Sequence, residues 1–483
     1  MGNAAKDLAA LRVENAALRA QIGQLEALRA ENAALRAQIG ELTGAVGELT
    51  GRVAELTARL RADSSNSSLP PSQDPPSARP RSLRRPSGRK PGGQAGHPGA
   101  TLEMAEHPDR VVVHRPERCQ GCGQAFEEDA EVVGVEARQV FDLPEEIRLI
   151  VVEHRLESLC CAACRSATKA AAPAGVSRQV QYGPNIASFA VYLVNRHYVA
   201  VGRASELLGE AFGAKVSPGS IQTMVDNLAG VLADRFAPVA KRILVAGPVL
   251  HVDETSFKVA GGKMWAHTAS NADAAWIEVH PTRGRKAVEE IGVVPRFRGV
   301  LVRDALALYD TFPDVGAHQL CTAHVERELQ AVVDFHAHPD GAWCWARQAK
   351  DAISAAIADP ADADRQRRLI ESALACAPNT DPDPPGKAGK RHKALRKRLK
   401  TRLDDYLRFT VDPNAPPTNN PAEQEIRSFK IKQKIAGTMR TPNGARAYAA
   451  IRSYLSTARR HNIPPLQALA TLTSTNPWLP TTP

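Results

Sequence analysis

The sequence predicts a multidomain α+β protein in which an N-terminal coiled coil, a small metal-binding domain and a helical domain precede an α/β domain with a helical insertion. Three observations lead to this prediction. Leucines recur every seven residues near the N-terminus, two Cys-x-x-Cys pairs follow, and beyond residue 245 strand-like runs that carry acids alternate with helical patterns. The 483 residues suffice for several domains, and a hydrophobic content of 43% suffices for buried cores.

The charge balance points weakly to nucleic acid. Lys and Arg outnumber Asp and Glu by 62 to 52, which gives a net charge of +10. The excess is modest for this length, but the cations cluster, and clustering strengthens the indication. No apolar run reaches the roughly 18 residues of a membrane span, and the N-terminus has no signal-peptide core. We therefore expect a cytoplasmic or nucleoid-associated protein in a reducing compartment.

Residues 1–62 carry the leucine stripe of a coiled coil. Two series have a spacing of seven residues: Leu11, Leu18 and Leu25, then Leu28, Leu35, Leu42, Leu49 and Leu56. The three-residue step between the series is a stammer, which overwinds the supercoil locally. Asn15 and Asn32 fall at the other core position, where a buried amide fixes the register. Because a single helix would leave the stripe in water, we expect this segment to self-associate.

Residues 63–105 are rich in Ser, Pro, Gly and Arg, a composition that cannot build a core and indicates a linker. Within it, six cations follow one another with no acid between them: Arg79, Arg81, Arg84, Arg85, Arg89 and Lys90. Such a run suits contacts with DNA phosphates. A solvated tail would explain the charge alone equally well.

Residues 106–170 contain two Cys-x-x-Cys pairs, which are Cys119 with Cys122 and Cys161 with Cys164. The segment between them reads as short strands, for instance at 131–140 and 147–153. Four thiolates from two such pairs make the tetrahedral site of a structural Zn²⁺ ion. The alternative, disulfide bonds, conflicts with a reducing compartment. Cys160 is an extra thiol that could replace Cys161 as a ligand.

Residues 171–244 alternate helical runs with turns. A helix over 204–212, a short turn and a helix that begins at Pro218 with Ser217 as its N-cap form a helix-turn-helix pattern. This pattern is either a DNA-reading motif or a packed helical hairpin. The second helix lacks basic residues and offers only Ser220, Gln222 and Thr223 as base-reading side chains, which favours the hairpin.

Residues 245–445 contain two apolar runs that carry acids. The apolar run at 247–259 is expected to deliver Asp253 and Glu254 into a polar turn, and a second strand-like run, at 299–310, carries Asp304. An ionised carboxylate at the end of a buried strand is costly unless it is paired or binds a metal. Each acid alone could simply begin a loop. A third acid, Glu423, makes a metal cage the stronger interpretation.

Glu423 is predicted to lie in the first turn of a helix. Asn420 suits the N-cap and Pro421 the first helical position. At this place Glu423 could also act as a capping-box partner, a role that uses the same oxygens as metal binding. A helix N-terminus favours the ionised carboxylate that a metal needs.

The remaining pattern of this domain predicts antiparallel strands at 264–268 and 274–280, a helix at 284–291 and a helical insertion at about 335–412. Residues 446–483 form a C-terminal helical segment that closes the domain. Cys321 and His324 have ligand-like spacing, but a lone Cys-x-x-His on an apolar helix face is more often part of a core.

The insertion contains nine cations in 16 residues with no acid among them: Lys387, Lys390, Arg391, Lys393, Arg396, Lys397, Arg398, Lys400 and Arg402. They would repel one another unless they met phosphates, so we expect the cluster to bind DNA together with Arg427 and Lys430. A solvated surface helix is the alternative.

The motifs HVDETSF (251–257), LVRDALALYD (301–310) and NNPAEQEIR (419–427) resemble those of the DDE transposases of the IS66 family. The linker sequence, SSNSSLPPSQD followed by RKPGGQAGHPG, also resembles the linker of that family, so the resemblance covers nearly the whole chain. Leu69 and Gln424 depart from it, because the family commonly has Lys and Arg there. The resemblance implies an RNase H-like catalytic domain with Asp253, Asp304 and Glu423 as the acidic triad.

The same resemblance implies a zinc-binding domain that contacts DNA or shapes the N-terminal module. It also matches a C-x-x-H-x-x-R signature, which makes His324 and Arg327 candidates for DNA or active-site contacts. Two Mg²⁺ ions roughly 3.5–4 Å apart would activate the nucleophile and stabilise the leaving oxygen, and carboxylates are the ligands that Mg²⁺ prefers. Water would serve as the nucleophile for cleavage and the freed 3′ hydroxyl for joining.

We therefore expect a bacterial-type DNA transposase of an insertion sequence, acting on double-stranded DNA at the element ends and the target. Its partners would be a second copy through the coiled coil and small accessory transposition proteins. Two other classes stay open, namely a catalytically inactive DNA-binding regulator derived from a transposase and a metal-dependent nuclease that cuts without joining.

Overall fold

The computed structural model describes residues 2–61, 63, 66, 102–144, 147–336, 343–381, 383–384, 386–472 and 477–481. The linker cations between 79 and 90 lie outside these residues. The chain divides into two units. One comprises 1–81, 156–206 and 216–483, and the other comprises 82–155 and 207–215.

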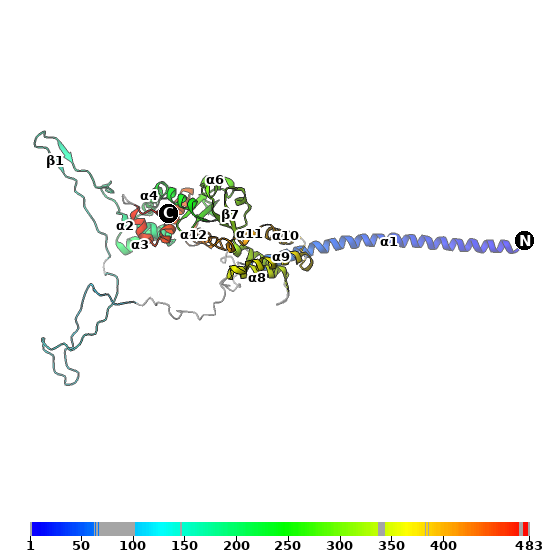
Figure 1. Cartoon of the computed structure of the whole chain (residues 1–483), viewed down its shortest axis with the longest axis horizontal. Coiled ribbons are helices and arrows are strands. Elements are labelled where there is room, and N and C mark those ends of the chain that lie inside the picture. Colours follow the sequence, from blue (N-terminus) through cyan, green and yellow to red (C-terminus); the bar gives the residue numbers. More distant parts are fainter. Residues whose placement is uncertain are drawn as a thin grey trace. The chain divides into compact units, whose positions relative to one another are not determined.

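The N-terminal segment is one unbroken helix, α1 (Gly2–Arg61), of 60 residues (Figure 1). It continues through the three-residue step between Leu25 and Leu28 and through the glycines that follow. The stripe leucines, from Leu11 to Leu56, are exposed along it. The helical part of the coiled-coil prediction is confirmed, and the partner helix stays a prediction.

The strands expected at 131–140 and 147–153 are wrong, because neither segment forms a strand. Their apolar side chains, such as Val133 and Ile150, are exposed. β-Propensity reflects packing on a partly buried pleated surface, and these residues have none to pack on. The strands that do form, β1 (Ser158–Cys160) and β2 (Ala167–Lys169), pair with each other around the second Cys-x-x-Cys turn.

Helices follow from residue 184, as the pattern predicted. They are α2 (Pro184–Arg196), α3 (Val201–Phe212), α4 (Pro218–Val231), the π-helical turn η2 (Leu232–Phe236) and α5 (Ala237–Ala246). The Ser217 side chain accepts a hydrogen bond from the Ser220 N–H at 3.0 Å, which confirms the predicted cap. One face of α4 is buried through Ile221, Val225 and Leu228. This burial is what the packed-hairpin interpretation requires.

The main sheet has five strands: β3 (Val249–Val259), β4 (Gly262–Ser270), β5 (Ala275–His280), β6 (Val300–Arg303) and β7 (Ala317–Leu320). Their order is β5-β4-β3-β6-β7, with β3, β4 and β5 antiparallel and with β6 and β7 parallel to β3. Ala260 and Gly261 both have positive φ angles, of 47° and 80°, as a two-residue turn between twisted strands requires.

Helix α13 (Pro442–Arg460) covers the edge of this sheet. The amides of Ala275 and Ile277 on β5 donate to the hydroxyls of Thr457 and Ser453 at 3.0 and 2.8 Å. An exposed strand edge can pair with a strand of another chain, and these hydroxyls prevent such pairing by accepting the hydrogen bonds of the edge amides. The main core lies here, around buried aromatic rings such as Tyr454. The shorter elements nearby are α6 (Arg285–Ile291), η3 (Val294–Arg296), η4 (Ala307–Thr311) and α14 (Pro465–Thr471).

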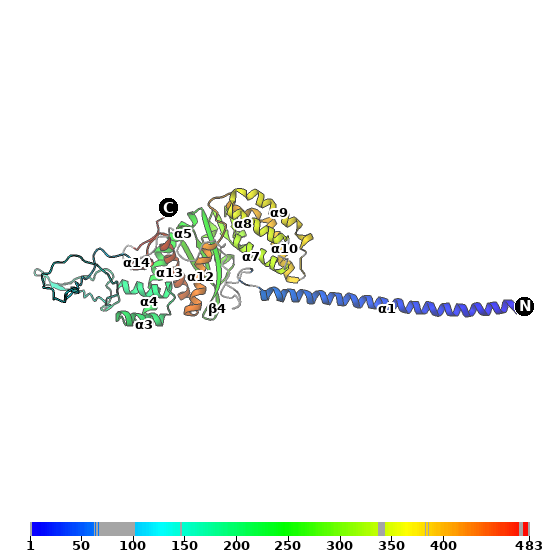
Figure 2. The same cartoon turned by 90° about the horizontal axis from the view of Figure 1, so that it is seen from below.

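The insertion is helical, as predicted (Figure 2). Its buried side chains form a second core together with Val300 of β6 and Leu320 of β7. Its elements, with the helix that leads into it, are α7 (Thr322–His336), α8 (Trp345–Ala358), η5 (Pro360–Asp362), α9 (Ala363–Thr380), α10 (Gly386–Thr401), α11 (Leu403–Tyr406) and η6 (Arg408–Thr410). Trp345 is the largest fully buried side chain of this core. The chain then returns to the sheet as α12 (Asn420–Ala436), which lies against β3 and β4.

Candidate metal and nucleic-acid site

The register of the parallel strands places Asp253 beside Asp304. His251 on β3 pairs with Val302 on β6, so the two aspartates stand at equivalent positions two residues further along. Neighbouring strands lie about 4.8 Å apart. The start of β6 depends on Gly299, where a Cβ atom would lie 2.3 Å from the Pro248 carbonyl oxygen. Two acids distant in the sequence therefore meet just beyond the point where the parallel pairing of β3 with β6 ends.

The third parallel strand, β7, brings Cys321 to the same edge. Arg303 pairs with Leu320, and the Cys321 N–H donates to the Arg303 carbonyl oxygen at 2.9 Å. Cys321 is buried, and this burial raises the pKa of its thiol to about 11. Open α/β sheets bind their ligands at the carboxyl ends of the strands, and the chemical groups of this domain gather there.

Ionisation of the Asp253 carboxyl is unfavourable in the folded chain. Burial raises the pKa of its carboxyl well above the usual range, and the neighbouring charges of Glu254 and Asp304 raise it further. Glu423 adds to this shift, whereas the Glu254 N–H, which donates to Asp253 Oδ1 at 2.8 Å, opposes it. Like-charged carboxylates that disfavour one another's ionisation are a setting in which a cation would be stabilising.

Arg283 links two of these acids. Its guanidinium donates to Glu254 Oε1 at 2.8 Å and lies 3.9 Å from Asp304 Oδ2. The Glu254 side chain is 1% exposed and also accepts a hydrogen bond from the Tyr309 hydroxyl at 2.8 Å. Burial raises the pKa of Glu254, and Arg283 lowers it. Sequence reasoning missed Arg283 and Tyr309, because nothing in the pattern places them near an acid.

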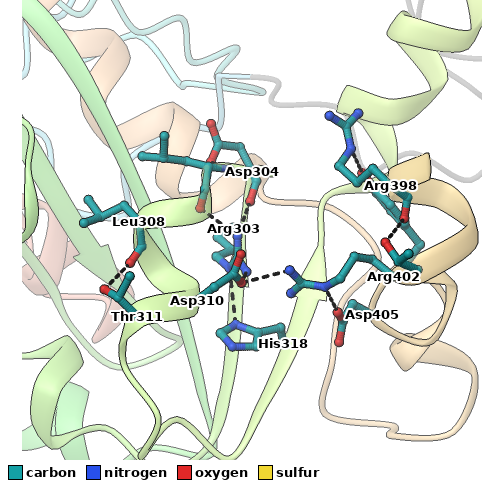
Figure 3. Close-up of polar contacts among 12 residues, drawn as sticks. Arg303, Asp304, Leu308, Asp310, Thr311, His318, Arg398, Arg402 and Asp405 are labelled. Atoms are coloured by element: carbon teal, nitrogen blue, oxygen red, sulfur yellow. Dashed lines mark hydrogen bonds and ion pairs between the residues drawn. The ribbon is translucent and has the colours of Figure 1, made fainter. Parts of the chain in front are cut away.

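The loop after Asp304 is fixed by its neighbour Arg303, whose side chain is 0% exposed. Arg303 donates to the carbonyl oxygens of Asp304 and Leu306 at 3.1 and 3.0 Å and forms an ion pair with Asp310 (Figure 3). Within this loop, the Leu306 N–H donates to Asp304 Oδ1 at 2.9 Å. The Asp304 carboxylate is thereby held in one orientation.

Glu423 lies in the first turn of α12, as predicted, although the predicted N-cap is wrong. The helix begins at Asn420, and the preceding residue is Asn419, whose side chain makes no cap bond. Instead the Asn419 amide group donates to the Val252 carbonyl oxygen at 2.8 Å, and its oxygen lies 3.1 Å from His251 Nδ1.

The Asn419 backbone N–H also donates to the Cys321 sulfur, at 3.2 Å. Asn419 is buried and so ties the start of α12 both to β3 and to the end of β7. Sequence reasoning missed this role. The only signal was the position of Asn419 within the NNPAE motif, which does not distinguish it from Asn420.

His324 and Arg327 both lie beside Glu423. His324 Nδ1 and Arg327 Nη2 each lie 3.7 Å from Glu423 Oε1. Glu423 Oε1 and His324 Nδ1 are buried, and neither has a hydrogen-bond partner among the described residues. Burial lowers the pKa of His324, and the charge of Arg327 lowers it further.

Cys321, His324 and Glu423 offer ligand atoms that all lie within 4.8 Å of one another. In the part of the chain that the structure describes, this is the one such group of three. Asp253 and Asp304 are not members of it, and the link between Asp253 and Glu423 is electrostatic. Sequence reasoning noticed the Cys-x-x-His spacing but favoured a core role, because it could not know that Glu423 packs beside it.

The basic helix α10 and Arg402, which follows it, correct one expectation, that these nine cations need phosphates to avoid repelling one another. Three of them are neutralised by acids from other segments. Arg396 pairs with Asp383 at 2.6 Å, Arg398 pairs with Glu328, and Arg402 pairs with Asp310 and Asp405. The six others are exposed: Lys387, Lys390, Arg391, Lys393, Lys397 and Lys400.

Two further cations lie on α12. Arg427 and Lys430 are both exposed, and the Lys430 ammonium group donates to the Ser256 carbonyl oxygen at 2.6 Å. Because α12 also carries Glu423, these cations and the acid belong to one rigid helix.

The two Cys-x-x-Cys turns have the same backbone hydrogen bonds. The Cys119 N–H donates to Gln124, and its carbonyl accepts from Gly123, at 2.8 and 2.9 Å. In the second turn Cys161 bonds in the same way to Ser166 and Arg165, both at 2.9 Å. The fifth residue of each turn, Gly123 or Arg165, has a positive φ angle, of 76° or 61°.

In each turn the pKa of one thiol is shifted toward the ionised form. The backbone N–H of Cys122 lowers the pKa of Cys119, and the Ser166 hydroxyl, 2.8 Å from the Cys164 sulfur, lowers the pKa of Cys164. Cys160 lies outside the repeated turn, on β1, and its thiol contacts the Arg165 carbonyl oxygen at 3.5 Å.

The fold and the site define an α/β domain whose acids and other metal-ligating groups lie where the parallel pairing of its strands ends, which is a class of site suited to divalent cations. Residues 179–447 match the model of the transposase IS66 family. This match covers more than half of the 483 residues, and the chain belongs to the IS66 family of transposases. The family confirms the resemblance inferred from the three motifs and identifies a DNA-processing enzyme that binds DNA.

Residues 5–103 match a family of unknown function, DUF6444. A search of curated proteins gave no match. Among the described residues, no helix is both long and apolar enough to cross a membrane.

Proposed function

We propose that this chain is the DNA transposase of an insertion sequence and that Asp253, Asp304 and Glu423 bind two Mg²⁺ ions for DNA cleavage and strand transfer. The observation that carries the proposal is the equivalent position of Asp253 and Asp304 on adjacent parallel strands, with the raised pKa of Asp253 that results from it. A raised or lowered pKa can also result from a structural ion-pair network, but such a network would contain a cationic partner for Asp253. No ion pair of Asp253 is found among the described residues.

The sheet supports an RNase H-like catalytic domain. Three antiparallel strands followed by two parallel ones, in the order β5-β4-β3-β6-β7, are what that resemblance implies. The helical insertion lies between the second and the third acid, so its length leaves the strand register that joins Asp253 to Asp304 unchanged.

The residues present fit Mg²⁺. Glu423 Oε1 is a buried oxygen without a hydrogen-bond partner, and Asp253 accepts a backbone N–H on one oxygen. Carboxylate oxygens are the hard ligands that Mg²⁺ prefers. When bound, the ions would activate the attacking oxygen and stabilise the leaving oxygen of a phosphodiester.

The chain's own residues orient these ligands. Arg283 restrains the Asp304 carboxylate from one side, and Arg303 fixes the loop that follows it. Asn419 sets the start of α12 against β3 and so positions Glu423. Arg327 and His324, each 3.7 Å from Glu423, are placed to contact a DNA phosphate that approaches this acid.

DNA contacts extend from this centre. We assign phosphate binding to the exposed cations Lys390, Arg391, Lys393 and Lys397 of α10, to Arg427 and Lys430 of α12, and to the linker cations Arg79, Arg81, Arg84, Arg85, Arg89 and Lys90. Arg396 and Arg398 contribute less, because each already has an acidic partner. The salt dependence of binding reports how many such contacts form.

The N-terminal part completes the proposal. Cys119, Cys122, Cys161 and Cys164 ligate one structural Zn²⁺ ion, because the two turns repeat one hydrogen-bond pattern in which Cys161 corresponds to Cys119. Cys160 stands outside that pattern and is not assigned as a ligand. Helix α1 pairs with that of a second copy through its leucine stripe.

A cleavage and strand-transfer reaction on the element's own ends tests the proposal. With Mg²⁺, the wild-type chain should nick the ends and join the freed 3′ hydroxyl to target DNA. Asp253→Asn, Asp304→Asn and Glu423→Gln should each lower the cleavage rate at least about a hundredfold while DNA affinity stays within about twofold.

Glu425→Gln is the matched control, because Glu425 lies on the same helix as Glu423 but pairs with Arg460 at 3.0 Å and contacts Ser456. This variant should lose stability and keep its cleavage rate per folded molecule. Nicks without joined products would replace the proposal by a nuclease. Binding without any Mg²⁺-dependent cleavage would replace it by a DNA-binding regulator.

A further inference from the structure

The group formed by Cys321, His324 and Glu423 has a ligand set unlike that of the carboxylates. We propose that these three residues form a second metal site for a borderline divalent ion such as Zn²⁺, and that this site shares Glu423 with the proposed Mg²⁺ centre. The metal site stands on its own geometry, and only its effect on cleavage rests on the proposed function.

The geometry is close to that of a bound ion. A tetrahedral Zn²⁺ with bonds of about 2.0–2.3 Å holds its ligands roughly 3.3–3.8 Å apart. The three ligand atoms here already lie within 4.8 Å of one another, so a contraction of about 1 Å would close the site. The ligands come from the end of β7, the first turn of α7 and the first turn of α12, which are elements fixed by packing.

Two of the ligand atoms lack a hydrogen-bond partner. His324 Nδ1 and Glu423 Oε1 are buried, and no hydrogen bond to either is found within the described part of the chain. Leaving such atoms unpaired is unfavourable, so native structures rarely do it without a bound group to satisfy them. The third ligand, the Cys321 sulfur, accepts one hydrogen bond, from the Asn419 backbone N–H at 3.2 Å. An N–H donor at this position stabilises a thiolate.

The mixed donor set selects the metal. Sulfur and imidazole favour Zn²⁺ and similar ions over Mg²⁺, which prefers oxygen ligands. Zn²⁺ binding would displace the thiol proton of Cys321 to solvent, and the thiolate and the Glu423 carboxylate would together balance the ion's charge. Arg327 lies 3.7 Å from the same Glu423 oxygen and opposes a cation there. Binding should therefore be reversible rather than permanent.

Sharing Glu423 has a functional consequence. An oxygen that ligates Zn²⁺ beside Cys321 is not free to hold Mg²⁺ beside Asp253, so filling one site weakens the other. The site would thus make cleavage sensitive to Zn²⁺-class ions.

Cobalt binding to the full-length, metal-stripped chain tests the site itself, with Co²⁺ alone as the probe. The Cys-x-x-Cys turns bind Co²⁺ in every variant, so the difference between variants isolates the new site. Cys321→Ser should bind one Co²⁺ per chain fewer than wild type. The wild-type-minus-variant spectrum should contain the weak thiolate-to-cobalt absorption of a single sulfur ligand. Cys376→Ser, which alters an exposed cysteine of α9, should match wild type.

Equal Co²⁺ stoichiometry in wild type and Cys321→Ser would overturn the proposal. Because Cys321 is buried, His324→Gln serves as a second variant with a partly exposed side chain, and it should also lose one Co²⁺. Far-ultraviolet circular dichroism identifies any variant that fails to fold. A folded His324→Gln chain that keeps full stoichiometry contradicts the site just as directly.

A second measurement separates the metal site from the proposed function. At constant Mg²⁺, added Zn²⁺ should lower wild-type cleavage at least tenfold, and it should lower Cys321→Ser cleavage less than threefold relative to that variant's own rate. Equal inhibition of both would overturn the sharing of Glu423. If the wild type shows no Mg²⁺-dependent cleavage, the proposed function fails, whereas the cobalt result still decides the metal site.

Discussion

Arg303 and Asp310 form an ion pair that closes the loop directly after Asp304, and the Arg303 side chain is completely buried (Figure 3). Asp310 also accepts a hydrogen bond from Arg402 at 2.9 Å, which joins this loop to the end of the basic helix α10. The loop that orients a proposed metal ligand is therefore fixed both from within the sheet and from the insertion.

Asp310→Asn should destabilise the chain by about 1–3 kcal/mol, because it leaves a buried guanidinium with a neutral partner. A value at the lower end is expected, since the Asp310 side chain is 37% exposed. Thermal unfolding followed by circular dichroism measures the change. Asp314→Asn is the control, because Asp314 pairs with Arg298 at 3.1 Å on the surface and should change stability by less than about 0.5 kcal/mol. Equal effects of both variants would contradict the structural role of the Arg303 pair.

The metal-free chain should be less stable at neutral than at acidic pH through Asp253. Its pKa is raised in the folded state, so the folded chain binds a proton more tightly than the unfolded chain. That contribution is fully present below the ordinary value of 3.8 and is lost as the pH rises through the raised pKa. Asp253→Asn, which carries no charge, should therefore raise the midpoint of thermal unfolding at pH 7 without added Mg²⁺.

The measurement is a set of melting curves between pH 5 and 8 for wild type and Asp253→Asn. The gap between the two should widen as the pH rises and should narrow when Mg²⁺ is added to wild type. Glu289→Gln, in which an exposed acid that pairs with Arg285 is changed, serves as the control. If Asp253→Asn is less stable than wild type throughout this range, the ionised Asp253 carboxylate does not destabilise the folded chain.

Asn419→Ala should lower Mg²⁺-dependent cleavage at least about tenfold and leave DNA affinity within about twofold. The change removes the hydrogen bonds to Val252 and His251 that set α12 against β3, so Glu423 loses its position but not its charge. Asn420→Ala is a matched control one residue away, since Asn420 is exposed. Raised Mg²⁺ should restore part of the Asn419→Ala rate, as expected for a positioning residue. Equal rates for the two variants would remove Asn419 from this role.

Cys161→Ser should reduce the bound Zn²⁺ by about one equivalent per chain, whereas Cys160→Ser should not. The backbone hydrogen bonds place Cys161, not Cys160, at the position that Cys119 holds in the first turn. Metal analysis of the freshly reduced full-length chain gives the answer. The opposite pattern would assign Cys160 as the ligand.

Leu18→Ser combined with Leu35→Ser should lower the molar mass measured by light scattering, because both leucines belong to the stripe that would pair two copies of α1. Val13→Ser changes an exposed apolar residue off the stripe and should leave the mass unchanged. A double variant with the wild-type mass would show that α1 does not hold the assembly together.

Features that depend on near neighbours in the chain could be predicted from the sequence. The long helix α1, the Ser217 cap, the strands that carry Asp253 and Asp304 and the helical insertion all follow from periodicity or local capping chemistry. The strands expected between 131 and 153 show where this reasoning ends. A period-two pattern gives a strand only where another strand or a core meets it.

The sequence alone therefore determined the long helix, the main-sheet strands and the helical insertion, whereas its assignment of the three acids stays a prediction. Only the tertiary structure decided which groups meet. The parallel register brings Asp253 to Asp304, and the packing of α12 on β3 brings Glu423 to Cys321 and His324. The physical reason is that these contacts join segments far apart in the chain. Their energies depend on burial and on partners in three dimensions, which no local pattern records.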